Sequence, residues 1–244
     1  MAERQVKSRE RVADHGEVNT AEREVNAMLD LVKQETERVD SRFLEPACGD
    51  GNFLAEILRR KLEAAKRRAI PPRKRKPLPL EFEKQSVIAV TSIYGVDILM
   101  DNVIICRKRM FDIWNAEYES VCKEEANDEC RAAIRFILER NIVCGNALTM
   151  KVADEQGNDT DQPIVFSEWT FVMGTRLRRK DYRFDKLLAG DYRPKAESII
   201  PAKGDIPTEE QISIFDGLEE QPSDEGEFLQ SYIADYRRIQ DYGS

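Results

Sequence analysis

The chain has little of several residue types on which common functional sites depend. Its 244 residues include one histidine, His15, so a histidine base or a histidine metal site has almost no material. Five cysteines are present, an odd number with no CxxC spacing: Cys48, Cys106, Cys122, Cys130 and Cys144. This pattern argues against a disulfide framework and against a zinc site. We therefore expect no bound metal and a reducing, cytoplasmic location.

Long apolar runs are also missing. No stretch of about 18 apolar residues occurs, so we expect no membrane span. The first residues, MAERQVKSRERVADHGE, are charged throughout and do not resemble a secretory signal. The net charge of −8 is unevenly distributed, because residues 59–76 hold ten basic residues and one acid, whereas residues 204–227 hold nine acids and no base. The basic segment is suited to phosphate binding, or it is a solvated helix end and loop.

Strand-like and helix-like patterns alternate along the chain. Helical periodicity covers residues 20–38, 52–68 and 98–114, and a long polar helix is expected within 116–140. Strand patterns cover residues 41–46, 86–98, 141–148 and 163–172, and the proline-rich residues 70–82 read as extended. Residues 173–188 suggest a basic hairpin or short helix, and residues 229–239 a last helix. Such alternation predicts an α/β fold with a mostly parallel sheet and helices on both faces.

Composition changes divide the chain into four parts. We expect a polar leader over residues 1–19 and a domain over 20–175 that contains a basic, proline-rich insertion at 66–86. A basic segment follows at 176–200, and an acidic tail with a short helix occupies 201–244.

The most informative stretch is FLEPACGDGNFLAEIL, residues 43–58, where a buried strand runs into a glycine turn and then a helix. Such a turn lets a ligand approach the backbone, because a Cβ atom would collide with it. The phosphate-binding pattern GxxxxGK[ST] is absent, and so is the dinucleotide pattern GxGxxG. An acid, Glu45, instead stands at the end of the strand.

LEPACGDGNFL closely resembles the first motif of adenosylmethionine-dependent DNA methyltransferases of the amino type, especially those that modify adenine N6. Other pieces follow in the order of that family. GEVNTAEREVNAML resembles the N-terminal motif, in which only Thr20 matches the usual aromatic-threonine-proline pattern. YGVDI resembles the second motif and VCGNAL the third. The resemblance covers about residues 12–172 and implies a class I methyltransferase fold, Rossmann-like in form.

The resemblance also implies residue roles in an adenosylmethionine pocket. Glu45 would counter the cationic methionine end, Asp97 would accept both ribose hydroxyls, and Thr20 would bind the carboxylate. Ile98 would pack on the face of the adenine ring. Asn146, where the family more often has aspartate, would form a hydrogen bond with the edge of that ring. The full set of cofactor residues is Thr20, Glu45, Ala47, Gly49, Gly51, Asn52, Asp97, Ile98 and Asn146.

The family's fourth motif, a polar residue followed by Pro-Pro and an aromatic residue, does not occur after the fourth predicted strand. In that motif the polar side chain accepts the amine protons and the ring stacks on the flipped base. Here Ser167 and Trp169 are the candidates for these catalytic roles, although Trp169 as a core or partner-facing aromatic is the favoured alternative. About 75 residues follow this strand. Because that is little for the remaining strands and a target-recognition domain, we expect an incomplete sheet.

Three functions stay open. The chain is an active adenine methyltransferase with a degenerate fourth motif, a cofactor- or DNA-binding pseudo-enzyme subunit of a restriction-modification or phage-defence system, or a pure interaction module. The missing motif favours the subunit, whose partner would be a second methyltransferase or restriction chain. Candidate DNA contacts after the fourth strand are Arg176, Arg178, Arg179 and Lys180, with a plain surface loop as the alternative.

One peptide in the acidic tail resembles the short motif with which bacterial proteins dock on the replication sliding clamp. It runs Gln211-Ile212-Ser213-Ile214-Phe215, and Gln211, Ile214 and Phe215 are its candidate partner-binding residues. The favoured alternative is that its apolar side chains fold back onto an open sheet edge of this protein.

Overall fold

A computed structural model describes residues 20–189, 200–201 and 228–242. Its first sheet has the strand order β1-β2-β3-β4-β5. The strands β1 (Phe43–Glu45), β2 (Ile93–Asp97) and β3 (Ile142–Asn146) run parallel, whereas β4 (Lys151–Ala153) and β5 (Asp159–Pro163) continue the sheet antiparallel. The α/β prediction is thus confirmed, but the sheet is mixed and not mostly parallel. The antiparallel pair was missed because its short, polar segments resemble a loop.

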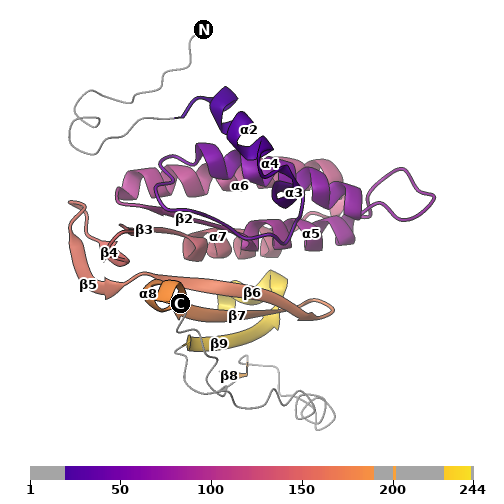
Figure 1. The fold of residues 1–244 in the computed structure, drawn as a ribbon. Helices are drawn as coiled ribbons and strands as arrows, with labels where there is room; N and C mark the ends of the chain where they lie inside the picture. The colour runs from indigo at the N-terminus through magenta and orange to yellow at the C-terminus, as the bar shows by residue number, and fades with distance from the viewer. Residues whose placement is uncertain (1–19, 190–199, 202–227, 243–244) are drawn as a thin grey trace.

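Helices cover the sheet as the alternating pattern predicted. Figure 1 shows α4 (Asn52–Arg68) and α6 (Met100–Cys122) on one face, with α2 (Glu22–Asp30) and α3 (Lys33–Thr36) beyond α4. On the other face lies α7 (Asp128–Asn141), which follows the short 3-10 helix η1 (Lys123–Glu125). All five residues of β2 are buried, as expected for a strand with layers on both sides.

The proline-rich segment and the residues after it differ from the prediction. We expected residues 70–82 to be extended and 86–98 to be a strand, but α5 (Pro79–Thr91) takes up the last four residues of the first range and the first six of the second. Pro79 starts the helix, where a missing N–H costs nothing. Phe82, Val87 and Val90 are all fully buried. A helix buried on several sides loses its polar stripe, and its sequence then resembles a strand.

A second sheet, whose strand pairs are antiparallel except at one edge, lies below α7 in Figure 1. Its order is β6-β7-β9-β8, formed by β6 (Val165–Met173), β7 (Arg176–Arg183), β9 (Phe228–Asp235) and β8 (Ile200–Pro201), with α8 (Phe184–Ala189) after β7. The predicted fourth strand is therefore a strand, but it pairs with β7 and not with the parallel sheet. Residues 173–188, predicted as a basic hairpin or a short helix, provide the second strand of the β6–β7 hairpin and then the short helix α8. The predicted last helix is instead β9 followed by the 3-10 helix η2 (Tyr236–Asp241).

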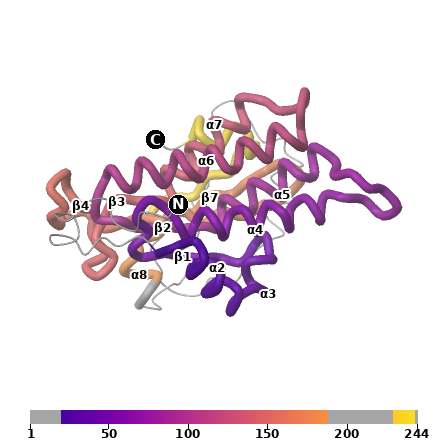
Figure 2. The backbone as a smooth tube through the Cα atoms, turned by 90° about the horizontal axis from the view of Figure 1, so that it is seen from above, coloured from indigo at the N-terminus to yellow at the C-terminus, as the bar shows by residue number. Residues whose placement is uncertain are grey.

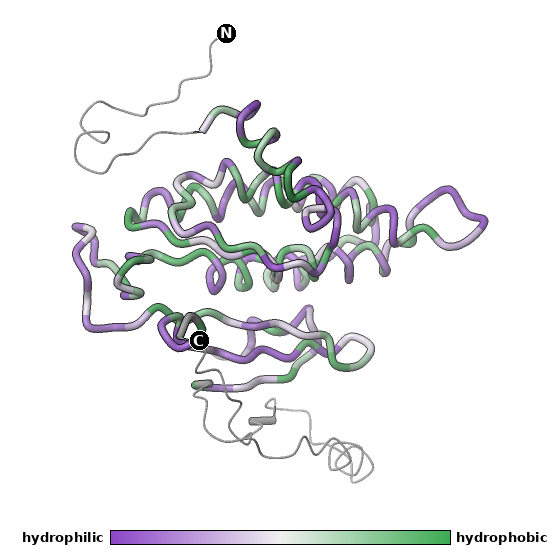
Figure 3. The backbone as a smooth tube through the Cα atoms, viewed as in Figure 1, coloured by the Kyte–Doolittle hydropathy of each residue, from purple (hydrophilic) through white to green (hydrophobic). Residues whose placement is uncertain are grey.

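A buried carboxylate, Glu83 of α5, connects the helices that cover the first sheet to η2, which follows the second sheet. It is 2% exposed and accepts hydrogen bonds from the hydroxyl of Tyr118 at 2.6 Å and from Arg237 Nε at 2.5 Å, and it also accepts from the hydroxyl of Tyr236. Tyr118 belongs to α6, whereas Tyr236 and Arg237 belong to η2. In Figure 3 green apolar and purple polar residues alternate along the helices on both sides of the first sheet. Glu83 therefore ties the end of the described chain to the helices.

A buried cation, Lys61 of α4, fixes the start of β1. Its ammonium group donates to the carbonyl oxygens of Val39 at 3.1 Å and of Ser41, and to Ser92 Oγ at 2.7 Å. It lies 5.2 Å from the centre of the Phe43 ring. Burial lowers the pKa of Lys61 to about 7. These bonds hold the segment before β1 against α4, and so set where the following glycine turn lies.

Candidate functional site

The glycine turn links β1 to α4 at the carboxyl end of the sheet, in a left-handed backbone conformation. Gly49 has φ +54° and Gly51 has φ +90°. The two glycines have different surroundings. A Cβ atom on Gly49 would meet no atom within 4 Å, whereas one on Gly51 would lie 2.6 Å from Cys106 Sγ of α6. Gly51 thus lets the turn pack on α6, while Gly49 faces open space.

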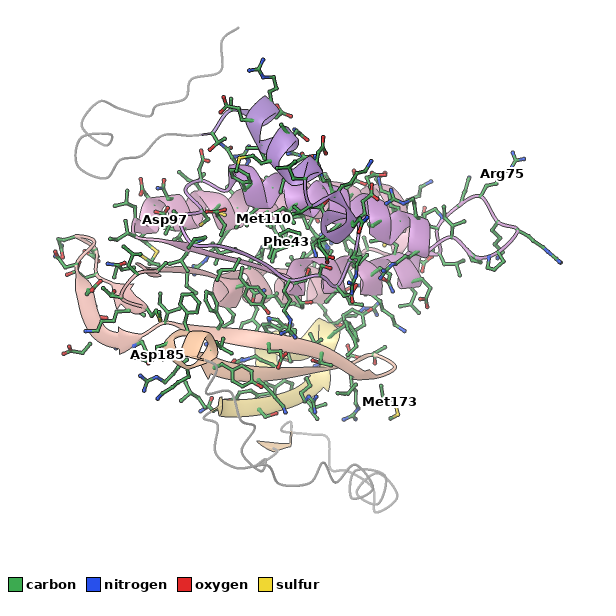
Figure 4. All side chains as sticks on the ribbon, in the orientation of Figure 1. Phe43, Arg75, Asp97, Met110, Met173 and Asp185 are labelled. Carbon is green, nitrogen blue, oxygen red and sulfur yellow. The ribbon has the colours of Figure 1, made fainter. Side chains whose placement is uncertain are left out.

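Asp97, at the end of β2, holds this turn in place. Its Oδ2 accepts the backbone N–H of Gly49 at 2.9 Å. Its Oδ1 accepts the backbone N–H of Leu99 at 2.9 Å and Asn102 Nδ2 at 3.1 Å. A carboxylate has about four acceptor positions, and in Asp97 three of them are occupied by donors of the protein itself. Figure 4 labels Asp97 at this end of the sheet.

Glu45 stands at the end of β1, next to the turn. Burial raises the pKa of its carboxyl group, and a hydrogen bond of 3.4 Å from the backbone N–H of Ala47 opposes this rise. A cation beside this carboxylate would stabilise its charged form. Ala47 itself is exposed at the mouth of the turn.

Thr20 and Asn52 meet on the other side of the turn. Asn52 Nδ2 donates to the backbone oxygen of Thr20 at 3.3 Å, and Asn52 Oδ1 accepts from Arg109 Nη1 at 2.6 Å. The segment before α2 is thereby held over the start of α4. The structure thus places Thr20, the first described residue of the predicted N-terminal motif, beside the start of α4.

Ile98 and Asn146 lie at the ends of the neighbouring strands. Cys144 Sγ, in β3, donates to the backbone oxygen of Ile98 at 3.5 Å. A Cβ atom on Gly157, in the β4–β5 hairpin, would lie 3.7 Å from Ile98 Cγ1, so the hairpin borders this side. Asn146 Oδ1 accepts the backbone N–H of Leu148 at 3.0 Å and therefore shapes its own turn.

Together these residues form one edge of the sheet, and we call this set the glycine-turn site: Thr20, Glu45, Ala47, Gly49, Gly51, Asn52, Asp97, Ile98 and Asn146. It offers a carboxylate, backbone groups and an open position above Gly49. Sequence reasoning missed Asn102 and Cys106 of α6, which support Asp97 and Gly51. Nothing in the residue pattern of a helix reveals such support, because it arises only when helix and turn meet.

Ser167 and Trp169 do not form a base-binding site in this structure. Ser167 is 2% exposed and its hydroxyl donates to Asp181 Oδ1 at 2.6 Å. Trp169 is 8% exposed, and its indole Nε1 donates to Asn141 Oδ1 at 2.8 Å. Both side chains pack between the second sheet and α7, because β6 pairs with β7 and not with β1. The core role expected as the alternative for Trp169 is the one observed.

Arg179 is internal too, contrary to its prediction as a DNA contact. It is 1% exposed and forms two hydrogen bonds with Asp181, of 2.8 Å and 2.5 Å. Lys180 is also buried, whereas Arg176 and Arg178 are half-buried. All four lie on β7, so they are strand residues of a sheet and not the free surface loop considered as the alternative.

The remaining predictions concern the single histidine, the tail peptide, metal binding and membrane spans. His15 and the peptide 211–215 lie outside the described residues. Within the described part of the chain, no cluster of three or more histidine, cysteine or acidic side chains is placed to bind a metal. No described helix is long and apolar enough to cross a membrane. A depression of about 330 Å³ between α6 and α7, lined by Ile104, Arg107, Phe111 and Arg135 among others, is separate from the glycine-turn site.

Comparison with known proteins identifies the family. Residues 18–176 match the family model of the MmeI DNA-methyltransferase domain. The chain belongs to this family. The match includes every residue of the glycine-turn site and ends at the first residue of β7. No curated protein and no solved structure matches the chain.

Proposed function

We propose that the chain binds adenosylmethionine at the glycine-turn site, on a class I methyltransferase fold of Rossmann-like form. The observation that carries the proposal is the hydrogen bond between Asp97 and the backbone N–H of Gly49. It brings the acid of the second motif onto the glycine turn of the first, beside an open position that a Cβ atom would occupy.

The chemistry of the residues fits the ligand. Adenosylmethionine carries a sulfonium and an ammonium group, and the half-buried Glu45 carboxylate would be stabilised by such charges. Thr20 and Asn52 would face the methionine carboxylate, and Ile98 and Asn146 the adenine ring. A ribose hydroxyl would use the remaining acceptor position of Asp97, and a second hydroxyl would replace one of its present donors.

We propose further that the chain acts as a subunit of an adenine-N6 DNA methyltransferase of a restriction-modification or phage-defence system. Methyl transfer needs the amine held in line with the sulfonium methyl group. The chain's own candidates, Ser167 and Trp169, are buried away from the glycine-turn site. This favours a cofactor-binding subunit over an enzyme that is active alone, with the amine-binding groups supplied by another chain.

Calorimetric titration with adenosylmethionine tests the binding, and Gly49→Leu is the diagnostic variant. A leucine there would fill the open position, so binding should be lost. Gly174, in the turn between β6 and β7, is a matched control, since it also has a positive φ, +57°, and open space around its Cβ position. Gly174→Leu should bind as the wild type does. Absent binding in the wild type would eliminate the proposal, and methyl transfer to DNA by the chain alone would overturn the subunit role.

A further inference from the structure

The side chain of Arg109, on α6, reaches the glycine turn from a neighbouring helix. Figure 2 shows α4 between α2 and α6, so segments from both sides meet the start of α4. Arg109 Nη1 donates to Asn52 Oδ1 at 2.6 Å and lies 3.5 Å from Asp50 Oδ1. Asp50 and Asn52 flank Gly51, and the Arg109 side chain is 36% exposed. Arg109 therefore brings a positive charge to the turn at a place that solvent and ligands can reach.

This contact decides which way the Asn52 amide faces. A guanidinium group has donors only, so the Asn52 atom that faces Arg109 must be the oxygen. The NH₂ group then faces the segment before α2, where it donates to the backbone oxygen of Thr20 at 3.3 Å. Within the described part of the chain its second N–H has no acceptor. If Arg109 were absent, the amide could turn and present its oxygen on that side instead.

The other charged groups around the turn are unfavourable for an anion. Glu45, Asp50 and Asp97 lie on the turn or beside it, and Asp97 is bonded to it directly. They would repel a carboxylate that entered the site, unless a donor and a positive charge offset the repulsion. The Asn52 amide is such a donor, and Arg109 is such a charge. Hydrogen bonds to a carboxylate are about twice as strong as those between neutral groups.

We propose that Arg109 gives the glycine-turn site its selectivity for ligands that carry a carboxylate group. It does so as a positioning residue, by holding the Asn52 amide with its N–H groups toward the ligand. The inference rests on the proposed binding of adenosylmethionine. It adds that the two charges at the methionine end are told apart, the ammonium by Glu45 and the carboxylate by Asn52 with Arg109.

The test compares adenosylmethionine with its decarboxylated form, which keeps the sulfonium and ammonium groups. Calorimetric titration of the full chain gives the ratio of the two Kd values. The wild type should bind adenosylmethionine at least about tenfold more tightly than the decarboxylated form. Arg109→Met should bind the two about equally, because its Asn52 amide is no longer oriented. Lys108→Met is the matched control, since it removes an exposed cation one residue earlier on α6, and it should keep the ratio of the wild type.

Asn52→Asp is a second variant, and it decides the matter alone if Arg109→Met does not fold. It keeps an acceptor for Arg109, and so the contact between α4 and α6, but an aspartate has no N–H to donate. Its negative charge should reverse the preference, so that the decarboxylated form binds more tightly. A loss of stability alone would weaken the binding of both ligands by the same factor and leave the ratio unchanged.

An unchanged ratio in Arg109→Met or in Asn52→Asp would therefore overturn the proposal. Equal affinity of the wild type for the two ligands would overturn it as well, while the proposed binding of adenosylmethionine would stand. Absent binding of either ligand to the wild type would overturn the proposed function, and this inference with it.

Discussion

Replacing Asp97 with asparagine is the sharpest test of how the glycine-turn site is built. The carboxylate accepts three hydrogen bonds, from Gly49, Leu99 and Asn102. An asparagine keeps one accepting oxygen and presents an NH₂ group in place of the other. If its oxygen serves Leu99 and Asn102, the N–H of Gly49 faces another donor. A hydrogen bond to a charged group contributes about 1.5–3 kcal/mol. We therefore expect Asp97→Asn to lower the free energy of unfolding by about 2 kcal/mol.

Urea unfolding followed by tryptophan fluorescence measures this change, since both tryptophans, Trp114 and Trp169, are buried. Asp112→Asn is the matched control, because it makes the same change on the exposed face of α6, in an ion pair with Lys108 of 2.5 Å. Such an exposed pair contributes at most about 1 kcal/mol. Amide exchange at Gly49 should also accelerate in Asp97→Asn alone. A loss no larger than that of the control would refute the structural role of Asp97.

Three other substitutions probe the rest of the molecule. Glu83→Gln removes the charge that binds Arg237 and should cost about 3 kcal/mol in urea unfolding. The same change at the exposed Glu81 of α5 should cost less than about 0.5 kcal/mol, and equal losses would contradict the connecting role of Glu83. For Lys61, the folded pKa of about 7 lies below its ordinary value of 10.5, so the unfolded chain binds the proton more tightly. Stability should therefore rise from about pH 7 towards pH 10.5, and Lys61→Met should lack this rise; a variant with the same pH profile as the wild type would exclude Lys61 as its cause. Trp169→Phe should lower stability by about 1–2 kcal/mol, through loss of the bond to Asn141, without changing affinity for adenosylmethionine. A changed affinity with unchanged stability would place Trp169 in the site after all.

The sequence predicted the local path of the chain through the site well. The residues that predict the strand, the glycine turn and the helix all lie within residues 43–68. The helix α4 begins and ends where its helical periodicity does. The acid of YGVDI stands at a strand end as expected. These features depend on neighbouring residues, which is why a single sequence can reveal them.

What the sequence could not show depends on contacts between distant residues. The strand pattern of residues 163–172 is correct, but nothing in it tells whether the strand pairs with β1 or, as observed, with β7. That pairing decides whether Ser167 and Trp169 face a ligand or the core. Likewise Arg179 reads as a surface cation until the pairing brings it, with Asp181, against α7.

The same limit applies to the buried helix α5. Its apolar residues are spread over several sides because α4, α6 and α7 surround it, and a sequence pattern cannot separate that from a strand. Burial on the first helical face also differs from what the apolar pattern suggests, because the side chains of Met28 and Val32 are exposed. Their positions share one helical face with those of Val25 and Leu29, but only the latter two are buried.

The central claim, that adenosylmethionine binds at the glycine turn, is tested most directly by backbone amide chemical shifts. Titration of the isotope-labelled chain should move the signals of Gly49, Gly51 and Leu99, which lie in the turn or share Asp97 with it. Signals from the depression between α6 and α7, such as those of Ile104 and Arg135, should stay in place. Shifts confined to that depression, or no shifts at saturating ligand, would contradict the account.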